Sequence, residues 1–171
     1  KRTIDLYGDH LIAGGEIDAA LQHFKLHLKD EPPQMDYYMA VIDMEEYLGH
    51  TDSLDHYVQR AMEVFPDDPT LPIRKANRLY VRGDLHGAIA TFEQALEMVQ
   101  TDSLRGQIWG YIGDTYNAIK ERVESEKADT TGYKMRLSAK KAQKKCFEAY
   151  ERSLALYSEN AMVMNNYAYF L

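Results

Sequence analysis

Apolar and small residues recur at a fixed interval of 34 residues through the first three fifths of this chain. Three glycines follow one another at that interval, as do two sets of apolar positions. The members are Gly15, Gly49 and Gly83; Phe24, Val58 and Phe92; and Leu28, Met62 and Leu96. Pro32 and Pro66 are separated by the same interval. So many coincident steps predict a chain built from repeats of one structural unit.

The repeated residues resemble the consensus of a known repeat family. A small residue precedes an aromatic one by four positions at Ala20–Phe24 and again at Ala88–Phe92. The small residue lets two helices approach, and the aromatic ring fills the gap one turn later. The segment Trp109-x2-Ile112-Gly113-x2-Tyr116 is close to W-x2-L-G-x2-Y. The chain thus resembles tetratricopeptide repeat (TPR) proteins, in particular bacterial multi-TPR proteins. The resemblance implies an all-α fold in which antiparallel helix pairs stack as a right-handed superhelix.

On this resemblance the chain is predicted to be a single TPR domain. Its expected units are 1–34, 35–68, 69–102 and 106–160, with a truncated fifth unit at 161–171. The expected helix pairs are 2–13 with 16–29, 35–48 with 51–64, and 70–82 with 85–99. The repeated glycines are expected at the turn inside each unit, where glycine easily meets a positive φ. Five residues depart from the family pattern. His27 replaces the usual alanine, Glu45 a large apolar residue and Leu54 a small one, while Gln100 and Ser158 replace the proline that follows the second helix.

The fourth unit contains 21 extra residues between its two helices, counted from Tyr116 and Tyr150. Both flanks of the insertion favour helix, and the cluster 129–132 favours a turn. An extended helical hairpin is therefore predicted at about 120–145. Its second arm carries a basic hairpin face, formed by Lys140, Lys141, Lys144 and Lys145. Two interpretations are open: the two arms pair their opposite charges across the seam, or this face binds an acidic partner or nucleic acid.

Composition narrows the function classes without naming one. The chain has 171 residues and a formal net charge of -7, which disfavours global attraction to nucleic acid or an anionic membrane. No stretch is apolar enough to span a membrane. The first residue is Lys1 rather than methionine, so a fragment of a longer protein is expected. The compartment stays open: cytoplasmic, or exported or lipid-anchored if a signal has been removed.

Candidate chemistry is sparse. His23 and His27 lie four residues apart on one predicted helix, the geometry of a two-histidine metal edge, but only Asp30 is near as a third ligand. The single cysteine, Cys146, falls at a small packing position with no histidine near it in sequence. Phosphate-loop, dinucleotide and nucleophile-elbow motifs are absent from the sequence. We therefore expect no catalytic residue, no metal, no cofactor and no enzymatic activity.

The remaining candidate is a surface. In TPR proteins the first helix of each unit lines a concave groove, and transfer of the family positions selects ten residues. They are Asp5, Asp9, Asp36, Met39, Asp43, Tyr47, Asn77, Tyr80, Asp114 and Asn117. One position reads Asp9, Asp43, Asn77 and Asp114 in successive units. Such a ladder either bonds the backbone of an extended ligand, as the equivalent asparagine does in peptide-binding relatives, or serves only as caps and solvated groups.

The resemblance implies a non-catalytic scaffold that binds a protein or peptide. The acidic ladder together with Met39, Tyr47 and Tyr80 favours a peptide with basic and apolar residues. Asp5 and Asp9 stand at the positions where chaperone-type relatives clamp a C-terminal carboxylate, which argues against that activity. Two alternatives stay open: a recruiting or sensory arm of a multidomain regulator or enzyme, and nucleic-acid contact through the basic hairpin face. Head-to-tail association of copies is a further possibility.

Overall fold

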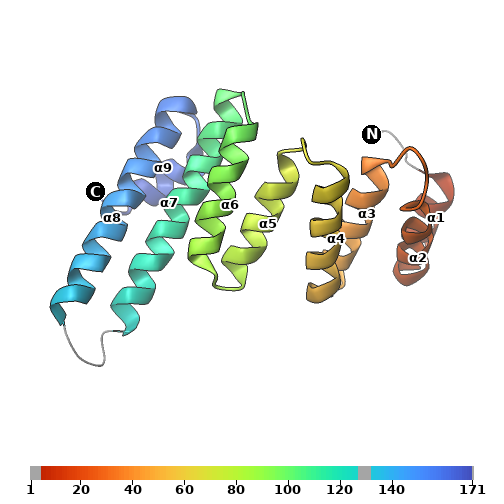
Figure 1. The fold of residues 1–171 in the computed structure, drawn as a ribbon, viewed down its shortest axis with the longest axis horizontal. Helices are drawn as coiled ribbons and strands as arrows, with labels where there is room; N and C mark the ends of the chain where they lie inside the picture. Colours follow the sequence, from red (N-terminus) through yellow and green to blue (C-terminus); the bar gives the residue numbers. More distant parts are fainter. Residues whose placement is uncertain (1–4, 127–131, 171) are drawn as a thin grey trace. The chain divides into compact units, whose positions relative to one another are not determined.

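The computed structural model describes residues 5–126 and 132–170, and the regular structure within these ranges is entirely helical (Figure 1). Nine helices follow one another there: α1 Leu6–Ala13, α2 Ile17–His27, α3 Met35–Tyr47, α4 Thr51–Val64, α5 Thr70–Val81, α6 Leu85–Met98, α7 Asp102–Ser125, α8 Gly132–Leu156 and α9 Ala161–Ala168. The predicted all-α fold is confirmed. The bounds of α2 to α6 differ from the predicted bounds by no more than two residues at either end.

Glycine forms the turn between the two helices of each of the first three helix pairs. Gly15, Gly49 and Gly83 have φ values of 77°, 71° and 84°. This left-handed region costs a residue with a Cβ about 1–2 kcal/mol, whereas glycine enters it freely. The 34-residue glycine interval therefore marks the sites where one helix ends and its partner begins.

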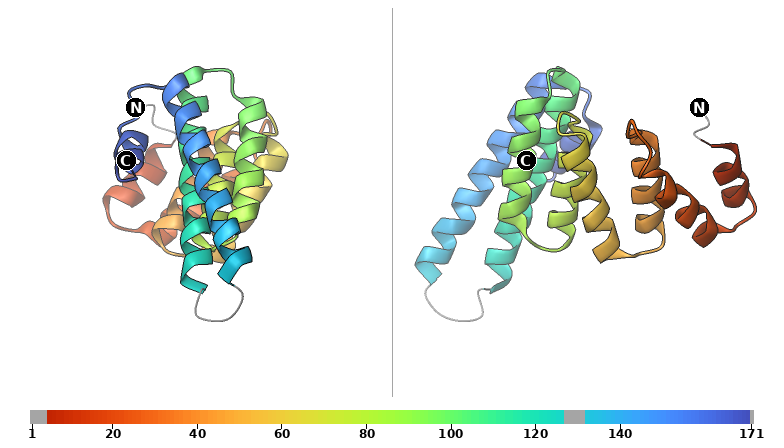
Figure 2. Two further views of the ribbon diagram at one scale, coloured as in Figure 1. Left: turned by 90° about the vertical axis from the view of Figure 1, so that its left-hand side faces the viewer. Right: turned by 45° about the vertical axis from the view of Figure 1, so that its right-hand side comes forward.

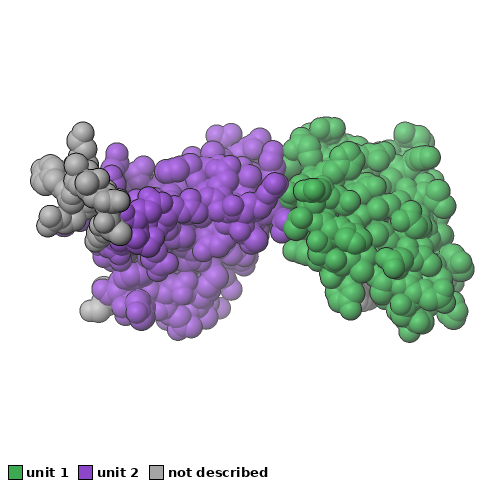
Figure 3. Space-filling view, turned by 90° about the horizontal axis from the view of Figure 1, so that it is seen from below, with its two compact units in different colours: residues 1–71 green, residues 72–171 purple. Residues whose placement is uncertain are grey.

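The chain divides into two compact units, residues 1–71 and residues 72–171 (Figure 3). In unit 1, α1 to α4 pack in sequence order around one apolar core. Its most deeply buried large side chains include Phe24, Tyr38 and Ile42. Leu54, at a position where the family prefers a small residue, is also buried in this core.

Glu45 is fully buried in unit 1 although the family favours an apolar residue at this position. Its carboxylate lies 2.6 Å from Lys25 Nζ and 2.7 Å from His50 Nδ1. A buried carboxylate is tolerated only where partners compensate for its lost hydration. The departure from the family pattern is thus matched by two further polar residues that surround it.

Unit 2 is built around the long pair α7 and α8, which lie side by side and extend past the loop between α5 and α6 (Figures 1 and 2). The predicted extended hairpin is therefore present, while residues 129–131 of its expected turn at 129–132 lie outside the described residues. Gly113 allows the close approach of the two helices, since a Cβ there would collide with the ring of Tyr150. The short helix α9 packs against both α7 and α8. No helix in the described part of the chain is both long and apolar enough to cross a membrane.

Candidate functional site

A cavity of about 530 Å³ opens in unit 2 between side chains of α5 to α9. Four of the ten predicted groove residues line it together: Asn77 and Tyr80 on α5, and Asp114 and Asn117 on α7. The fold brings them together because the first helices of consecutive units lie on the same side of a stack of helix pairs. We call this cavity the unit-2 pocket.

Asp114 is held by partners from two other helices. Its Oδ1 accepts hydrogen bonds from the Tyr150 hydroxyl of α8 at 2.5 Å and from Asn166 Nδ2 of α9 at 2.8 Å. Burial raises the pKa of the Asp114 carboxyl above its usual 3.8, and these two hydrogen bonds oppose that shift. Asp114 therefore links α7 to α8 and α9, and its Oδ1 already accepts hydrogen bonds from two donors. This differs from the open, ligand-facing ladder position that the sequence suggested as one interpretation.

Asn117 presents the most unusual polar group in the unit-2 pocket. Its Nδ2 donates a hydrogen bond to Glu121 Oε1 at 3.2 Å. Its Oδ1 is buried and accepts no hydrogen bond from the described residues. An unpaired buried acceptor costs about 1–3 kcal/mol, so it is uncommon unless another molecule supplies the donor.

Exposed aromatic and apolar side chains form part of the pocket lining. Tyr80 is 40% exposed and Tyr169 is 87% exposed, while Met162 also reaches the surface. Burial raises the pKa of the Tyr80 hydroxyl, and the nearby carboxylates of Asp114 and Glu121 add to the shift. The pocket lining thus combines apolar surface with acidic side chains.

The other six predicted groove residues belong to unit 1, and one of them has a different role. Asp5 caps the first helix and forms a 2.7 Å contact with His23, whose hydrogen bond lowers the pKa of the Asp5 carboxyl. The remaining five are surface or near-surface groups. Asp9, Asp36, Asp43 and Tyr47 are exposed, and Met39 packs partly against the unit 1 core.

The basic hairpin face lies on α8 in unit 2. Lys140, Lys141, Lys144 and Lys145 are all exposed. Lys144 lies 3.8 Å from Glu148 one turn along the same helix, and Lys145 Nζ lies 5.3 Å from the ring centre of Tyr116. These are intrahelical and ring contacts of modest strength.

Cys146 is buried at the centre of the same helix, and burial raises the pKa of its thiol to about 11. A thiol with such a pKa is protonated at neutral pH and is a poor nucleophile. The position therefore behaves as a packing site, in agreement with the small residue that the repeat favours there.

Sequence reasoning misses two residues of the unit-2 pocket that hold Asp114. The repeat explains Tyr150 only as the aromatic of a packing step, and Asn166 only as part of a truncated unit. Asn166 lies 52 positions after Asp114, and no local spacing links the two residues. The available signal is the prediction that 161–171 begins a fifth repeat, whose first helix would pack next to the first helix of the fourth.

The described helices and their pairing define the class of fold: this is the TPR fold. A scan of family models finds no match to the sequence, and no curated protein is detectably similar to it. Solved structures do match over most of the chain. One is described as MamA, with a TM-score of 0.67 and 13% identity over 95% of this chain and 80% of that one.

Two further matches are described as TPR proteins. YrrB, "a TPR protein with an unusual peptide-binding site", matches with a TM-score of 0.64 and 16% identity over 94% of this chain and 71% of that one. TTC0263, a thermophilic TPR protein from Thermus thermophilus, matches with a TM-score of 0.60 and 16% identity over 94% of this chain and 76% of that one. The resemblance deduced from the repeated residues is therefore confirmed for the fold.

Proposed function

We propose that the chain is a non-catalytic binding scaffold whose unit-2 pocket takes a peptide segment with basic and apolar residues. The buried, unpaired Oδ1 of Asn117 carries this proposal. A backbone N–H of a bound peptide would supply the missing donor. Because an unsatisfied acceptor costs free energy in the empty pocket, its satisfaction would favour binding.

The lining of the unit-2 pocket supports the same class of ligand. Glu121 is exposed beside Asn117 and offers a carboxylate to a basic side chain. Tyr80 offers an aromatic ring to an aliphatic or cationic group. A solved structure of the same fold, YrrB, is itself described as having an unusual peptide-binding site. The same pocket would serve a recruiting arm within a longer regulator or enzyme.

A selection of random peptides displayed on phage, performed on the wild-type chain, tests the proposal. Enriched peptides are then measured by fluorescence polarisation against Asn117→Ala and Tyr80→Ala. Each variant is expected to weaken binding at least about tenfold, which corresponds to about 1.4 kcal/mol. Tyr47→Ala is the matched control, because it removes an exposed tyrosine from unit 1.

The selection also has clear opposing results. Failure to enrich any peptide over an unrelated helical protein would contradict the proposal. So would peptides that bind both pocket variants as tightly as they bind the wild type. A peptide lost only in Tyr47→Ala would place binding on unit 1 and refute the assignment to the unit-2 pocket.

A further inference from the structure

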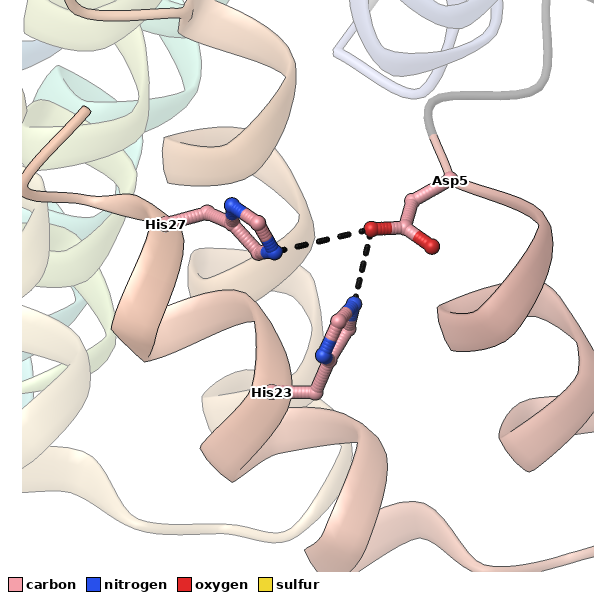
Figure 4. Close-up of side chains that lie close together, drawn as sticks. All are labelled: Asp5, His23 and His27. Carbon is pink, nitrogen blue, oxygen red and sulfur yellow. Dashed lines mark hydrogen bonds and ion pairs between the residues drawn. The ribbon is translucent and has the colours of Figure 1, made fainter. Parts of the chain in front are cut away.

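Three side chains with metal-ligating atoms converge in unit 1, where the start of α1 meets α2 (Figure 4). They are Asp5, His23 and His27. Asp5 Oδ2 lies 2.7 Å from His23 Nε2 and 3.7 Å from His27 Nε2. The three ligand atoms all lie within 4.8 Å of one another. The carboxylate and the two imidazoles thus approach one point in space.

The backbone fixes where each of the three groups lies. Asp5 is the N-cap of α1, and its Oδ1 accepts hydrogen bonds from the N–H groups of Tyr7 at 2.9 Å and Gly8 at 3.2 Å. This cap leaves Oδ2 directed at the histidines (Figure 4). His23 and His27 are four residues apart on α2 and therefore share one face of that helix. The site is built from two helices and needs no loop to close.

Neighbouring side chains hold both imidazole rings. His27 Nδ1 lies 2.7 Å from Asp30 Oδ2, and the ring stacks on Tyr37 with centroids 4.6 Å apart. The His23 ring meets Tyr7 edge-on with centroids 4.9 Å apart. A carboxylate that accepts the Nδ1–H of a histidine orients its Nε2 lone pair, which is the usual outer contact of a metal-bound imidazole. Asp30, the third ligand considered from sequence, has this supporting position instead.

Hydrogen bonding within the cluster leaves one ligand atom without a direct contact to the carboxylate. The 2.7 Å contact between His23 and Asp5 is an ordinary hydrogen bond. His27 Nε2, at 3.7 Å from the same oxygen, is too distant for one. Since its Nδ1 already faces Asp30, His27 directs its remaining nitrogen toward the shared oxygen. A cation between the three atoms would engage all of them.

The distances fit a four-coordinate ion after small movements. Zinc bonds of about 2.0–2.2 Å in a tetrahedron place ligand atoms about 3.3 Å apart. The two observed separations from Asp5 Oδ2, 2.7 and 3.7 Å, lie on either side of that value. Two imidazoles and one carboxylate are also the ligand types that zinc accepts in proteins.

We propose that Asp5, His23 and His27 form a zinc site that fastens the start of α1 to α2, with water at the fourth position. The side chains of Asp5, His23 and His27 are 16%, 18% and 32% exposed, so solvent reaches the site. Zinc bound only by the folded unit multiplies the ratio of folded to unfolded unit 1 by about 100 when its free concentration is 100 times Kd. Zinc bound at this site therefore stabilises the folded state of unit 1.

Isothermal titration calorimetry on the untagged, chelator-treated chain tests the proposal with zinc chloride as the probe. The expected result is saturable binding of one zinc ion per chain, with little heat from magnesium because magnesium prefers oxygen ligands. Co2+ in place of zinc is expected to give visible absorption bands of a four-coordinate ion, which reports the ligand set independently of heat.

Two variants remove a ligand with different effects on packing. His23→Gln keeps an N–H near Asp5 Oδ2 but removes the imidazole nitrogen, and His27→Ala removes a partly exposed ring. Circular dichroism verifies that each variant folds. Both are expected to weaken zinc binding at least about tenfold. His86→Ala, which changes an exposed histidine of unit 2, is the matched control and should bind as the wild type does.

Two results would overturn the proposal. One is the absence of saturable zinc binding by the wild-type chain. The other is binding of one ion per chain with the same affinity in His23→Gln and His27→Ala. A loss of binding in His86→Ala equal to that in the ligand variants would equally place the ion elsewhere.

Discussion

Asp114 allows the polar centre of unit 2 to be tested with two closely matched substitutions. Asp114→Ala removes the oxygen that accepts hydrogen bonds from Tyr150 and Asn166. Asp114→Asn can retain a carbonyl oxygen at the same place while removing the charge. The two variants therefore separate the contribution of the acceptor from that of the charge.

The magnitude for Asp114→Ala follows from burial of the donors. Tyr150 is 1% exposed, so the loss of the acceptor for its hydroxyl costs about 1–3 kcal/mol. Asn166 is partly exposed and adds about 0.5–1 kcal/mol. We expect a loss of about 1.5–4 kcal/mol in unfolding free energy. Asp114→Asn should remain within about 1 kcal/mol of wild type, because a neutral acceptor needs less hydration than a carboxylate.

The charge adds a pH dependence of known sign. Burial raises the pKa of Asp114 in the folded chain above its usual 3.8, so the folded state holds its proton to higher pH than the unfolded state does. The stability from this group is fully present below pH 3.8 and is lost as pH rises through the raised value. Asp114→Asn lacks this loss, and its stability relative to wild type should therefore increase from acidic to neutral pH.

Urea unfolding followed by tryptophan fluorescence measures the unfolding free energy of unit 2, where Asp114 lies. Trp109 is the only tryptophan of the chain and lies on α7, with the Arg152 guanidinium 4.7 Å from its ring centre. Its emission consequently reports the unfolding of unit 2. Equal destabilisation by Asp114→Ala and Asp114→Asn would refute the reasoning, since it would show that the shared acceptor contributes nothing.

Two other predictions concern buried groups. Glu45→Met should leave the thermal midpoint unchanged or raise it, because an apolar side chain at this buried position needs no compensating partner. The side chains of Lys25 and His50 are 24% and 51% exposed, so water can replace the carboxylate; a fall of several degrees in a circular dichroism melt would contradict this. Cys146 should react with a thiol reagent at least about a hundredfold more slowly in the native chain than in urea, because the thiol is buried and has a pKa of about 11. Rapid native labelling, measured by absorbance, would show an accessible thiolate instead.

The repeat made the helices of this chain predictable. Helix ends depend on local features, such as a glycine at positive φ, and these recur every 34 residues. The long pair α7 and α8 was predictable by counting, because Tyr116 and Tyr150 kept their family roles while the distance between them grew. A residue of the pocket lining was predictable only where its position in the repeat is enough to place it on the pocket side of its helix, as for Asn77 and Asn117.

The polar contacts were not predictable, because they join residues that no sequence spacing relates. Asp5 matched a family groove position, yet it caps α1 and contacts His23, which lies 18 residues further on. Asp114 matched a ladder position, yet it is occupied by hydrogen bonds from α8 and α9. In both cases the helix bearing the residue was correctly placed, and the partner came from another helix whose facing side chain the repeat does not specify.

The polar side-chain clusters of unit 1 lie at positions where the sequence departs from the repeat pattern. A residue that follows the family pattern is explained by packing, so it gives little information on function. His27 replaces an expected alanine and completes the cluster with Asp5 and His23. Glu45 replaces an expected apolar residue, and two polar partners accompany it. A polar residue at a packing position lowers stability unless polar partners compensate for it. The partners that it contacts therefore identify the residues whose presence is linked to the departure. The zinc titration tests a departure from the repeat for which we propose a metal ligand. Glu45→Met tests a departure whose partners, Lys25 and His50, belong to the chain itself.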